Sequence, residues 1–211
     1  MSILLVAGLG NPGREYANTR HNLGFILLDA LARRHALAWK TQPAHQAETA
    51  RWDNAPGGRA ILLAKPLTYM NDSGAALQSL ARYHKIPPAQ IAIAYDDLAI
   101  DLGHVKVSVT GSAGGHNGIA SILQHLGDGF IRYRLGTGPR RPPKMDMKDF
   151  VLGKFTTDQQ TLIETTLPHY IDGLTLLLEH GADQAMNTLN RRTKTENKTK
   201  ENKTKENEPT T

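Results

Sequence analysis

Short apolar runs alternate with amphipathic helical stretches along this chain, and this alternation constrains the fold more than any other feature. Residues 2–8 (SILLVAG) form a continuous apolar run ending in glycine, as in a strand buried on both faces. The other predicted strands cover residues 47–52, 59–65, 90–96, 104–109 and 130–136. The predicted helices cover residues 21–35, 72–84, 116–126, 157–180 and 182–190. This order predicts an α/β fold in which a mixed sheet has helices on both faces.

The first two predicted helices carry specific expectations about capping and burial. Thr19 precedes the periodic residues of the first helix and is its candidate N-cap. The second helix offers Leu77, Leu80, Ala81 and Tyr83 to the core.

The chain divides by composition into a body and a tail. Residues 1–190 have the length expected of one compact domain. Residues 191–211 are expected to be disordered, because they repeat the unit NKTKE and offer no apolar side chain whose burial could offset the entropy of ordering. Such a tail either serves only as a solvated extension or makes a weak electrostatic contact with RNA.

Composition excludes several classes of protein. The chain contains no cysteine, so it has neither a disulfide framework nor a thiolate metal site or nucleophile. Its start lacks a basic n-region, and its first apolar run is too short for a signal peptide or a membrane span, so we expect a soluble cytoplasmic protein. Of the net charge of +5, +3 lies in residues 191–211, where seven Lys and Arg stand against four Glu. Nucleic-acid binding by the body would therefore need a local basic patch.

Residues 8–22 (GLGNPGREYANTRHN) place glycines directly after the first strand in the G-x-G-x-x-G spacing of dinucleotide-binding loops. Two features argue against a nicotinamide site. Pro12 interrupts the turn into the helix, and Arg33 and Arg34 stand about where an acidic residue would bind the ribose. The loop instead offers a polar platform at the carboxyl end of a strand, the usual place for a site in an open α/β sheet.

His21 follows this loop, near the start of the first helix. Histidine titrates near neutral pH, as a general base requires. The chain has nine histidines, and a surface or core-edge position explains most of them. Asn11, Tyr16 and Asn22 are equally well explained as turn and cap residues.

Two further motifs end in polar residues after a predicted strand. In KPLTYMNDSG (65–74), Asn71 either belongs to a group of helix-capping residues or points its amide into a crevice where negative charge develops. In YDDLAID (95–101), adjacent carboxylates suggest a metal, but we find no converging set of ligands. Asp96 and Asp97 point in opposite directions on a strand, so only one of them can orient a histidine.

The segment TGSAGGHNGIAS (110–121) is a Gly-rich loop that opens a helix. Its glycines permit close backbone approach and the helix N-terminus favours anions, so a tRNA phosphate or 3′-terminal nucleotide is an acceptable ligand. The alternative is a tight loop with Asn117 as the cap.

The densest basic stretch of the body follows this loop and its helix: Arg132, Arg134, Arg140, Arg141, Lys144 and Lys148. These residues either follow a phosphate backbone or belong to a solvated edge strand.

Together and in this order, the motifs resemble those of bacterial-type peptidyl-tRNA hydrolases. GLGNPGREYANTRHNLGF (8–25) and GSAGGHNGIASI (111–122) look like the two signature segments of that family, and KPLTYMNDSG is similar to its middle motif. DFVLGKF (149–155) and AMNTLN (185–190) resemble its C-terminal half, so the likeness covers about residues 1–190. It implies a single three-layer α/β domain with a mixed, mostly parallel sheet. It also implies an enzyme without metal or cofactor that cuts the ester between a peptide and the 3′ end of tRNA, rescuing stalled or dropped-off peptidyl-tRNA.

The resemblance implies roles for individual residues. His21 is implied as the general base that activates a water, with Asp96 holding its imidazole. Asn11, Asn71 and Asn117 are implied around the scissile ester and the first peptide unit. The remaining residues implied in binding line the substrate crevice or contact tRNA: Tyr16, Met70, His116, Asn117, Lys106 and Arg134.

The implied partner is peptidyl-tRNA, bound through its acceptor stem and 3′ end by a monomer that needs no membrane and no protein partner. Two residues depart from the family pattern. Ser108 stands where many members carry a second basic residue after Lys106, and Asp72 follows Asn71 where a neutral residue is common. From the residues alone, two other classes stay open: a non-catalytic tRNA- or RNA-binding module, and a nicotinamide enzyme based on the three glycines.

Overall fold

The structure is a computed structural model that describes residues 3–140 and 144–191. Its centre is a single seven-stranded sheet in the order β2-β3-β4-β1-β5-β7-β6. The strands are β1 Leu5–Gly8, β2 Lys40–Gln42, β3 Ala47–Ala55, β4 Arg59–Pro66, β5 Ile91–Asp101, β6 Val105–Ser108 and β7 Ile131–Gly138. The helices are α1 Leu23–Arg34, α2 Ser73–His84, α3 Asn117–Leu126, α4 Met147–Leu152 and α5 Thr157–Leu189. Two 3₁₀ turns, η1 Arg20–Asn22 and η3 Met70–Asp72, precede α1 and α2, and two more are η2 Pro43–His45 and η4 Pro88–Gln90.

The sheet has a parallel centre and antiparallel edges. Strands β4, β1, β5 and β7 pair in parallel, whereas β2, β3 and β6 add antiparallel pairings at the two ends. The central strands read as continuous apolar runs because helices cover both of their faces. The predicted mixed, mostly parallel sheet is confirmed.

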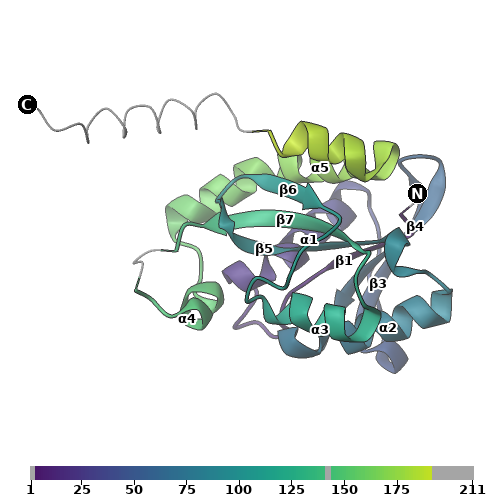
Figure 1. The fold of residues 1–211 in the computed structure, drawn as a ribbon, viewed down its shortest axis with the longest axis horizontal. Helices are drawn as coiled ribbons and strands as arrows, with labels where there is room; N and C mark the ends of the chain where they lie inside the picture. The colour runs from purple at the N-terminus through teal and green to yellow at the C-terminus, as the bar shows by residue number, and fades with distance from the viewer. Residues whose placement is uncertain (1–2, 141–143, 192–211) are drawn as a thin grey trace, which may run out of the picture.

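Helices cover the sheet in two layers. Figure 1 shows α5 along one side of the sheet and α2 and α3 along the other. One core cluster packs α1 and α5 against the sheet, and a second packs α2 and α3 against the opposite face. The predicted single three-layer domain is therefore confirmed for the described residues.

Some local expectations need correction. Tyr83 is 70% exposed, so its predicted burial is wrong; it lies on the outer side of α2, against the rings of His45 and His84. Thr19 precedes η1, but its hydroxyl donates to the carbonyl of Tyr16 instead of capping a helix. Gly181 has a φ of 81° and interrupts α5, which matches the two helices predicted from the sequence.

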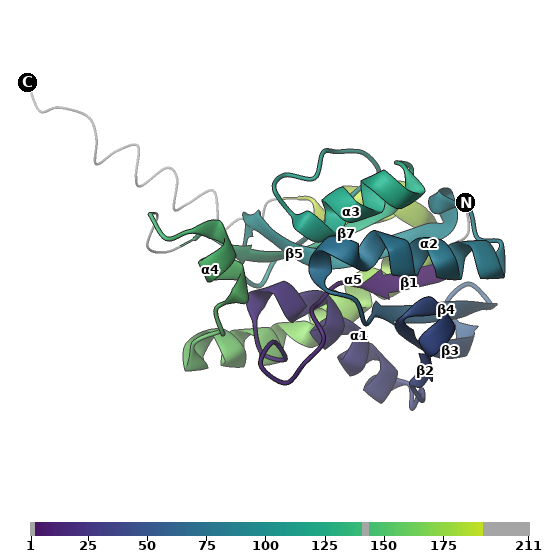
Figure 2. The same ribbon diagram turned by 90° about the horizontal axis from the view of Figure 1, so that it is seen from below.

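The strand order places polar side chains at one end of the sheet. From β1 the chain runs through α1 to β2 at one edge of the sheet and returns through β3 to β4, beside β1. From β4 it then passes to β5, on the other side of β1. Loops that leave β1, β4 and β5 therefore diverge around β1, which is the switch point where α/β sheets form binding crevices. Figure 2 shows α4 beyond this end of the sheet.

The predicted tail lies outside the described residues from residue 192 on, as does Arg141. Among the helices of the described part, none has the length and apolar character needed to cross a bilayer.

Candidate active site

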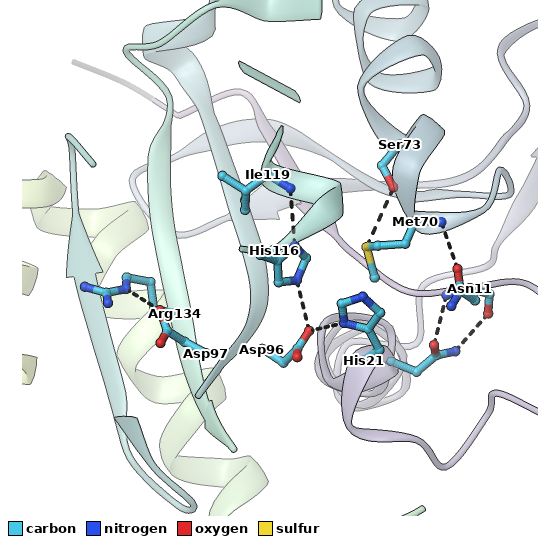
Figure 3. A network of polar contacts seen from close by, with 10 residues as sticks. Asn11, His21, Met70, Ser73, Asp96, Asp97, His116, Ile119 and Arg134 are labelled. Atoms are coloured by element: carbon cyan, nitrogen blue, oxygen red, sulfur yellow. Dashed lines mark hydrogen bonds and ion pairs between the residues drawn. The ribbon is translucent and has the colours of Figure 1, made fainter. Parts of the chain in front are cut away.

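A buried carboxylate on β5 holds two histidines that come from different parts of the chain. Asp96 Oδ1 lies 2.9 Å from His21 Nδ1 and 3.0 Å from His116 Nε2 (Figure 3). Asp96 is 2% exposed, and His21 comes from η1 at the carboxyl end of β1. The structure therefore brings together the histidine and the aspartate that the sequence pairs.

The charge of Asp96 fixes the protons on both rings. Burial by itself raises the pKa of this carboxyl, but electrostatic attraction to the rings of His21 and His116, together with the hydrogen bonds from both, holds the pKa well below its usual range. An ionised carboxylate can only accept hydrogen bonds, so each histidine donates to it. His21 consequently carries its proton on Nδ1, and its Nε2 is left as an acceptor.

Three hydrogen bonds fix the position of Asn11. The Asn22 side chain accepts from the Asn11 backbone N–H at 2.9 Å and donates to the Asn11 carbonyl at 2.9 Å. The Asn11 side-chain oxygen accepts from the backbone N–H of Met70 at 2.8 Å. These contacts fix the Asn11 amide with its oxygen occupied, so its NH₂ group is the end left for a ligand. Asn22 performs this clamp, a role its sequence position did not reveal.

Packing against α1 explains two glycines of the G-x-G-x-x-G pattern. A Cβ on Gly8 would collide with the carbonyl of Gly24, and one on Gly10 would lie 2.7 Å from the ring of Phe25. The loop therefore needs glycines to approach α1, and this requirement accounts for them without a pyrophosphate.

The second carboxylate of the pair, Asp97, faces away from Asp96 and binds Arg134. Its Oδ2 lies 2.8 Å from Arg134 Nε, and its Oδ1 accepts from the backbone N–H of Ala99 at 2.8 Å. Lys106 on β6 is the register partner of Arg134, so both cations lie on the same face of the sheet. The opposite orientation expected for Asp96 and Asp97 is confirmed.

Two buried arginines hold loops around the site, and neither role was predicted. Arg132 is 3% exposed and donates to the carbonyls of Gly111 and Ser112, so it is not free to bind phosphate. Its strand β7 lies inside the sheet, which also excludes the edge-strand alternative. Arg20 donates to the carbonyls of Phe150, Gly153 and Lys154 and stacks over Phe150, which ties η1 to the end of α4. Buried cations satisfied by carbonyls have no sequence signature.

Asp96, both of its histidines and Asn11 line one crevice of about 830 Å³. The expected site residues that line it are Asn11, Tyr16, His21, Met70, Asn71, Asp96, His116, Asn117 and Arg134. Lys106 is outside the lining, beside Arg134. The sequence missed Tyr69, which is 60% exposed in the crevice, and the α4 wall that begins at Asp146.

Helix capping near the crevice differs from the capping that the sequence offered for Asn117 and Asn71. His116, not Asn117, is the N-cap of α3, because its Nδ1 accepts from the backbone N–H of Ile119. Asn117 is left exposed in the first turn, on the crevice. Asp72 occupies the N-cap position of α2 without a side-chain cap bond, and Asn71 is exposed beside it.

His21, Asp96 and His116 also form a group whose possible metal-ligand atoms lie within 4.8 Å of one another. Both ring nitrogens, however, approach the same carboxylate oxygen at hydrogen-bond distance. An ion would have to displace both protons, so the arrangement fits a hydrogen-bonded carboxylate better than a metal centre.

Comparisons with known proteins identify the family of this chain. The peptidyl-tRNA hydrolase family model matches residues 5–199. A peptidyl-tRNA hydrolase of Gloeobacter violaceus is 42% identical over 91% of this chain and 96% of its own length, and one of Aquifex aeolicus is 40% identical over 91% and 98%. The crystal structure of peptidyl-tRNA hydrolase from Acinetobacter baumannii superposes with a TM-score of 0.82 at 36% identity, covering 90% of this chain and 96% of that one. With the motifs, the fold and the whole length of its relatives in agreement, this chain belongs to the peptidyl-tRNA hydrolase family.

Proposed function

We propose that this protein hydrolyses the ester that joins a peptide to the 3′ end of tRNA, with His21 as the general base. The observation that carries the proposal is the 2.9 Å bond from His21 Nδ1 to the buried Asp96, which leaves Nε2 unprotonated in a crevice of about 830 Å³. Family membership supports the substrate, since the relatives are named for peptidyl-tRNA hydrolysis.

In the proposed reaction, His21 Nε2 takes a proton from a water whose oxygen attacks the ester carbonyl carbon. The carbonyl oxygen becomes negatively charged in the tetrahedral intermediate. When the intermediate collapses, the bond to the ribose oxygen breaks, and the imidazolium of His21 returns the proton to that oxygen. The products are the free peptide carboxylic acid, which ionises in water, and tRNA with its terminal hydroxyl. Asp96 holds the ring in one tautomer and stabilises the imidazolium.

An asparagine amide meets the developing oxyanion in this mechanism. The sequence favoured Asn71, which lines the crevice but is exposed. Asn11 is the better preorganised donor, because Asn22 and Met70 fix its amide with the NH₂ group free. We therefore assign the oxyanion contact to Asn11 and place Asn71 and Asn117 along the first peptide unit.

The rest of the substrate is proposed to extend from this centre in two directions. Tyr16, Met70 and His116 line the crevice that takes the peptide and the terminal nucleotide. Lys106 and Arg134, one strand apart, bind a phosphate of the acceptor stem. Ser108 provides no further charge, so this clamp has two cations. In the cell, such an enzyme acts in the cytoplasm on stalled or dropped-off peptidyl-tRNA, with residues 1–190 as a monomeric catalytic domain.

A turnover assay on an N-acetylated aminoacyl-tRNA tests the proposal. Wild type should release free tRNA, and His21→Ala should bind the substrate without hydrolysing it. Binding without turnover in the wild type would favour the alternative of a non-catalytic tRNA-binding module.

A further inference from the structure

Asp96 binds two histidines through one oxygen, and the proposed hydrolysis uses only one of them. The rings of His21 and His116 lie 4.7 Å apart between centroids, and both reach the same carboxylate oxygen (Figure 3). We propose that His116 is a positioning residue, locked as a neutral Nε2–H tautomer that takes up part of the charge of Asp96 and so keeps His21 unprotonated. This inference rests on the proposed function.

The cap of α3 locks the tautomer. The backbone N–H of Ile119 donates to His116 Nδ1 at 3.2 Å, so that nitrogen carries no proton. The remaining nitrogen, Nε2, carries the proton and directs it at Asp96 at 3.0 Å. The rings of Tyr95 and His116 pack in a T-shaped arrangement with centroids 5.0 Å apart, which restricts the rotation of the His116 ring. Protonating Nδ1 would break the cap, so His116 cannot serve as a second base.

The donated bond changes what Asp96 does to His21. Hydrogen bonds to a carboxylate stabilise its charge, and two donors on one oxygen share that charge. Without the His116 donor, the full charge of Asp96 would act on His21 and favour the imidazolium, which cannot accept a proton from water. His116 therefore extends the activity of the base to lower pH.

The other described charged groups that line the crevice do not hydrogen-bond His21, so the protonation of His21 depends on Asp96 and His116. Tyrosines aside, the remaining ionisable groups of the lining are Asp97, Arg132, Arg134, Asp146 and Lys148. Asp97 and Arg134 pair with each other, and Arg132 is bound to loop carbonyls. Asp146 caps α4 by accepting from the backbone N–H of Lys148. None of these five makes a hydrogen bond to His21 among the contacts of the described residues.

The substitution His116→Asn removes the hydrogen bond to Asp96 and keeps a side chain that can cap α3. Asparagine is a good N-cap, so α3 should keep its start, but its shorter side chain cannot reach Asp96. The acid limb of kcat/KM should move to higher pH by about half a unit to one unit, a roughly three- to tenfold loss below the limb. Asp96→Asn should move the same limb to lower pH. The matched control is His125→Asn, also on α3, whose ring bonds the Ser121 carbonyl outside the crevice and whose loss should leave the limb in place.

Imidazole nitrogen NMR on the full chain tests the lock without substrate. His116 should show an unprotonated Nδ1 and a protonated Nε2 with no change between about pH 5 and 8. An acid limb that stays in place or moves to lower pH in His116→Asn, or a His116 ring that titrates alongside His21, would overturn the proposal. Absence of turnover in the wild type would instead overturn the proposed function, and the NMR spectra would still decide the state of His116.

Discussion

Asp96 and Asp97 are neighbours on β5 with the same side chain, yet they lie in different environments. Asp96 is fully buried and accepts hydrogen bonds from two histidines, and within residues 3–140 and 144–191 no arginine or lysine forms an ion pair with it. Asp97 is partly exposed and paired with Arg134. Because successive side chains of a strand point to opposite faces, one residue of separation is enough to divide the proposed chemistry from the proposed tRNA contact.

The two pairs differ in how they respond to their surroundings. A buried carboxylate that accepts two N–H bonds is insulated from salt, whereas a partly exposed ion pair is screened and contributes little to stability. We therefore expect pH to control the Asp96 side of β5 and ionic strength to control the Asp97 side.

The largest effect should come from His21 itself. His21→Ala removes the ring nitrogen proposed to accept the proton of water, and general base catalysis contributes roughly 10² to 10⁴ in rate. We expect kcat to fall by that factor while the KM for N-acetylated aminoacyl-tRNA changes little. A variant that kept more than about a tenth of the activity, far above what loss of a general base allows, would place the base elsewhere.

The comparison is tested directly by the matched pair Asp96→Asn and Asp97→Asn. Asp96→Asn should lower kcat substantially and move the acid limb of kcat/KM to lower pH, because the imidazolium loses the charge that stabilises it. Asp97→Asn should leave that limb in place and reduce kcat much less. The pH profiles of both variants decide the matter: an unmoved limb with full activity in Asp96→Asn would mean that Asp96 does not orient His21.

The same carboxylate gives the stability of the fold a pH dependence. The pKa of Asp96 is lowered from its ordinary value of 3.8, so it stabilises the native state above that pH. This contribution is lost as the pH falls through the lower, native-state value. In Asp96→Asn, the free energy of unfolding should therefore depend less steeply on pH on the acid side.

Sequence patterns predicted most elements and the opposite orientations of Asp96 and Asp97, because apolar periodicity and strand alternation are local properties. They did not predict that Asn22 clamps Asn11 or that His116 caps α3, because each contact depends on a partner placed by tertiary packing. Tyr83 shows the limit of periodicity: it falls within an amphipathic pattern and still lies on the outer side of α2. For Arg132 the sequence left open a phosphate contact or a solvated edge strand. It indicated neither carbonyl partner, because these lie in a loop that only the fold brings near.

A smaller, salt-dependent effect is expected at Arg134. Arg134→Ala should weaken tRNA binding and flatten the log–log salt dependence of the affinity by roughly 0.7 to 0.9, as for the loss of one phosphate contact. The acid limb of kcat/KM should not move, since Arg134 faces away from Asp96. Unchanged affinity and slope would remove Arg134 from the clamp, and Lys106→Ala provides the parallel measurement on the neighbouring strand.

The smallest effect should follow removal of residues 193–211. Every residue of this segment is polar, charged or proline, so it offers no apolar surface to the domain. The last contact that the structure describes near it belongs to Asn190, whose amide bonds both backbone groups of Val107 on β6, next to Lys106. Truncation after Arg192 keeps that contact, so melting temperature and turnover should stay at the wild-type values. Asn190→Ala is the matched comparison and should cost about 1 kcal/mol, because it leaves the edge of β6 without those hydrogen bonds. A drop of more than about 4 °C on truncation would mean that the tail contributes to the fold. If truncation flattened the log–log salt dependence of the affinity for tRNA, the tail would contribute to tRNA binding, as proposed for Arg134.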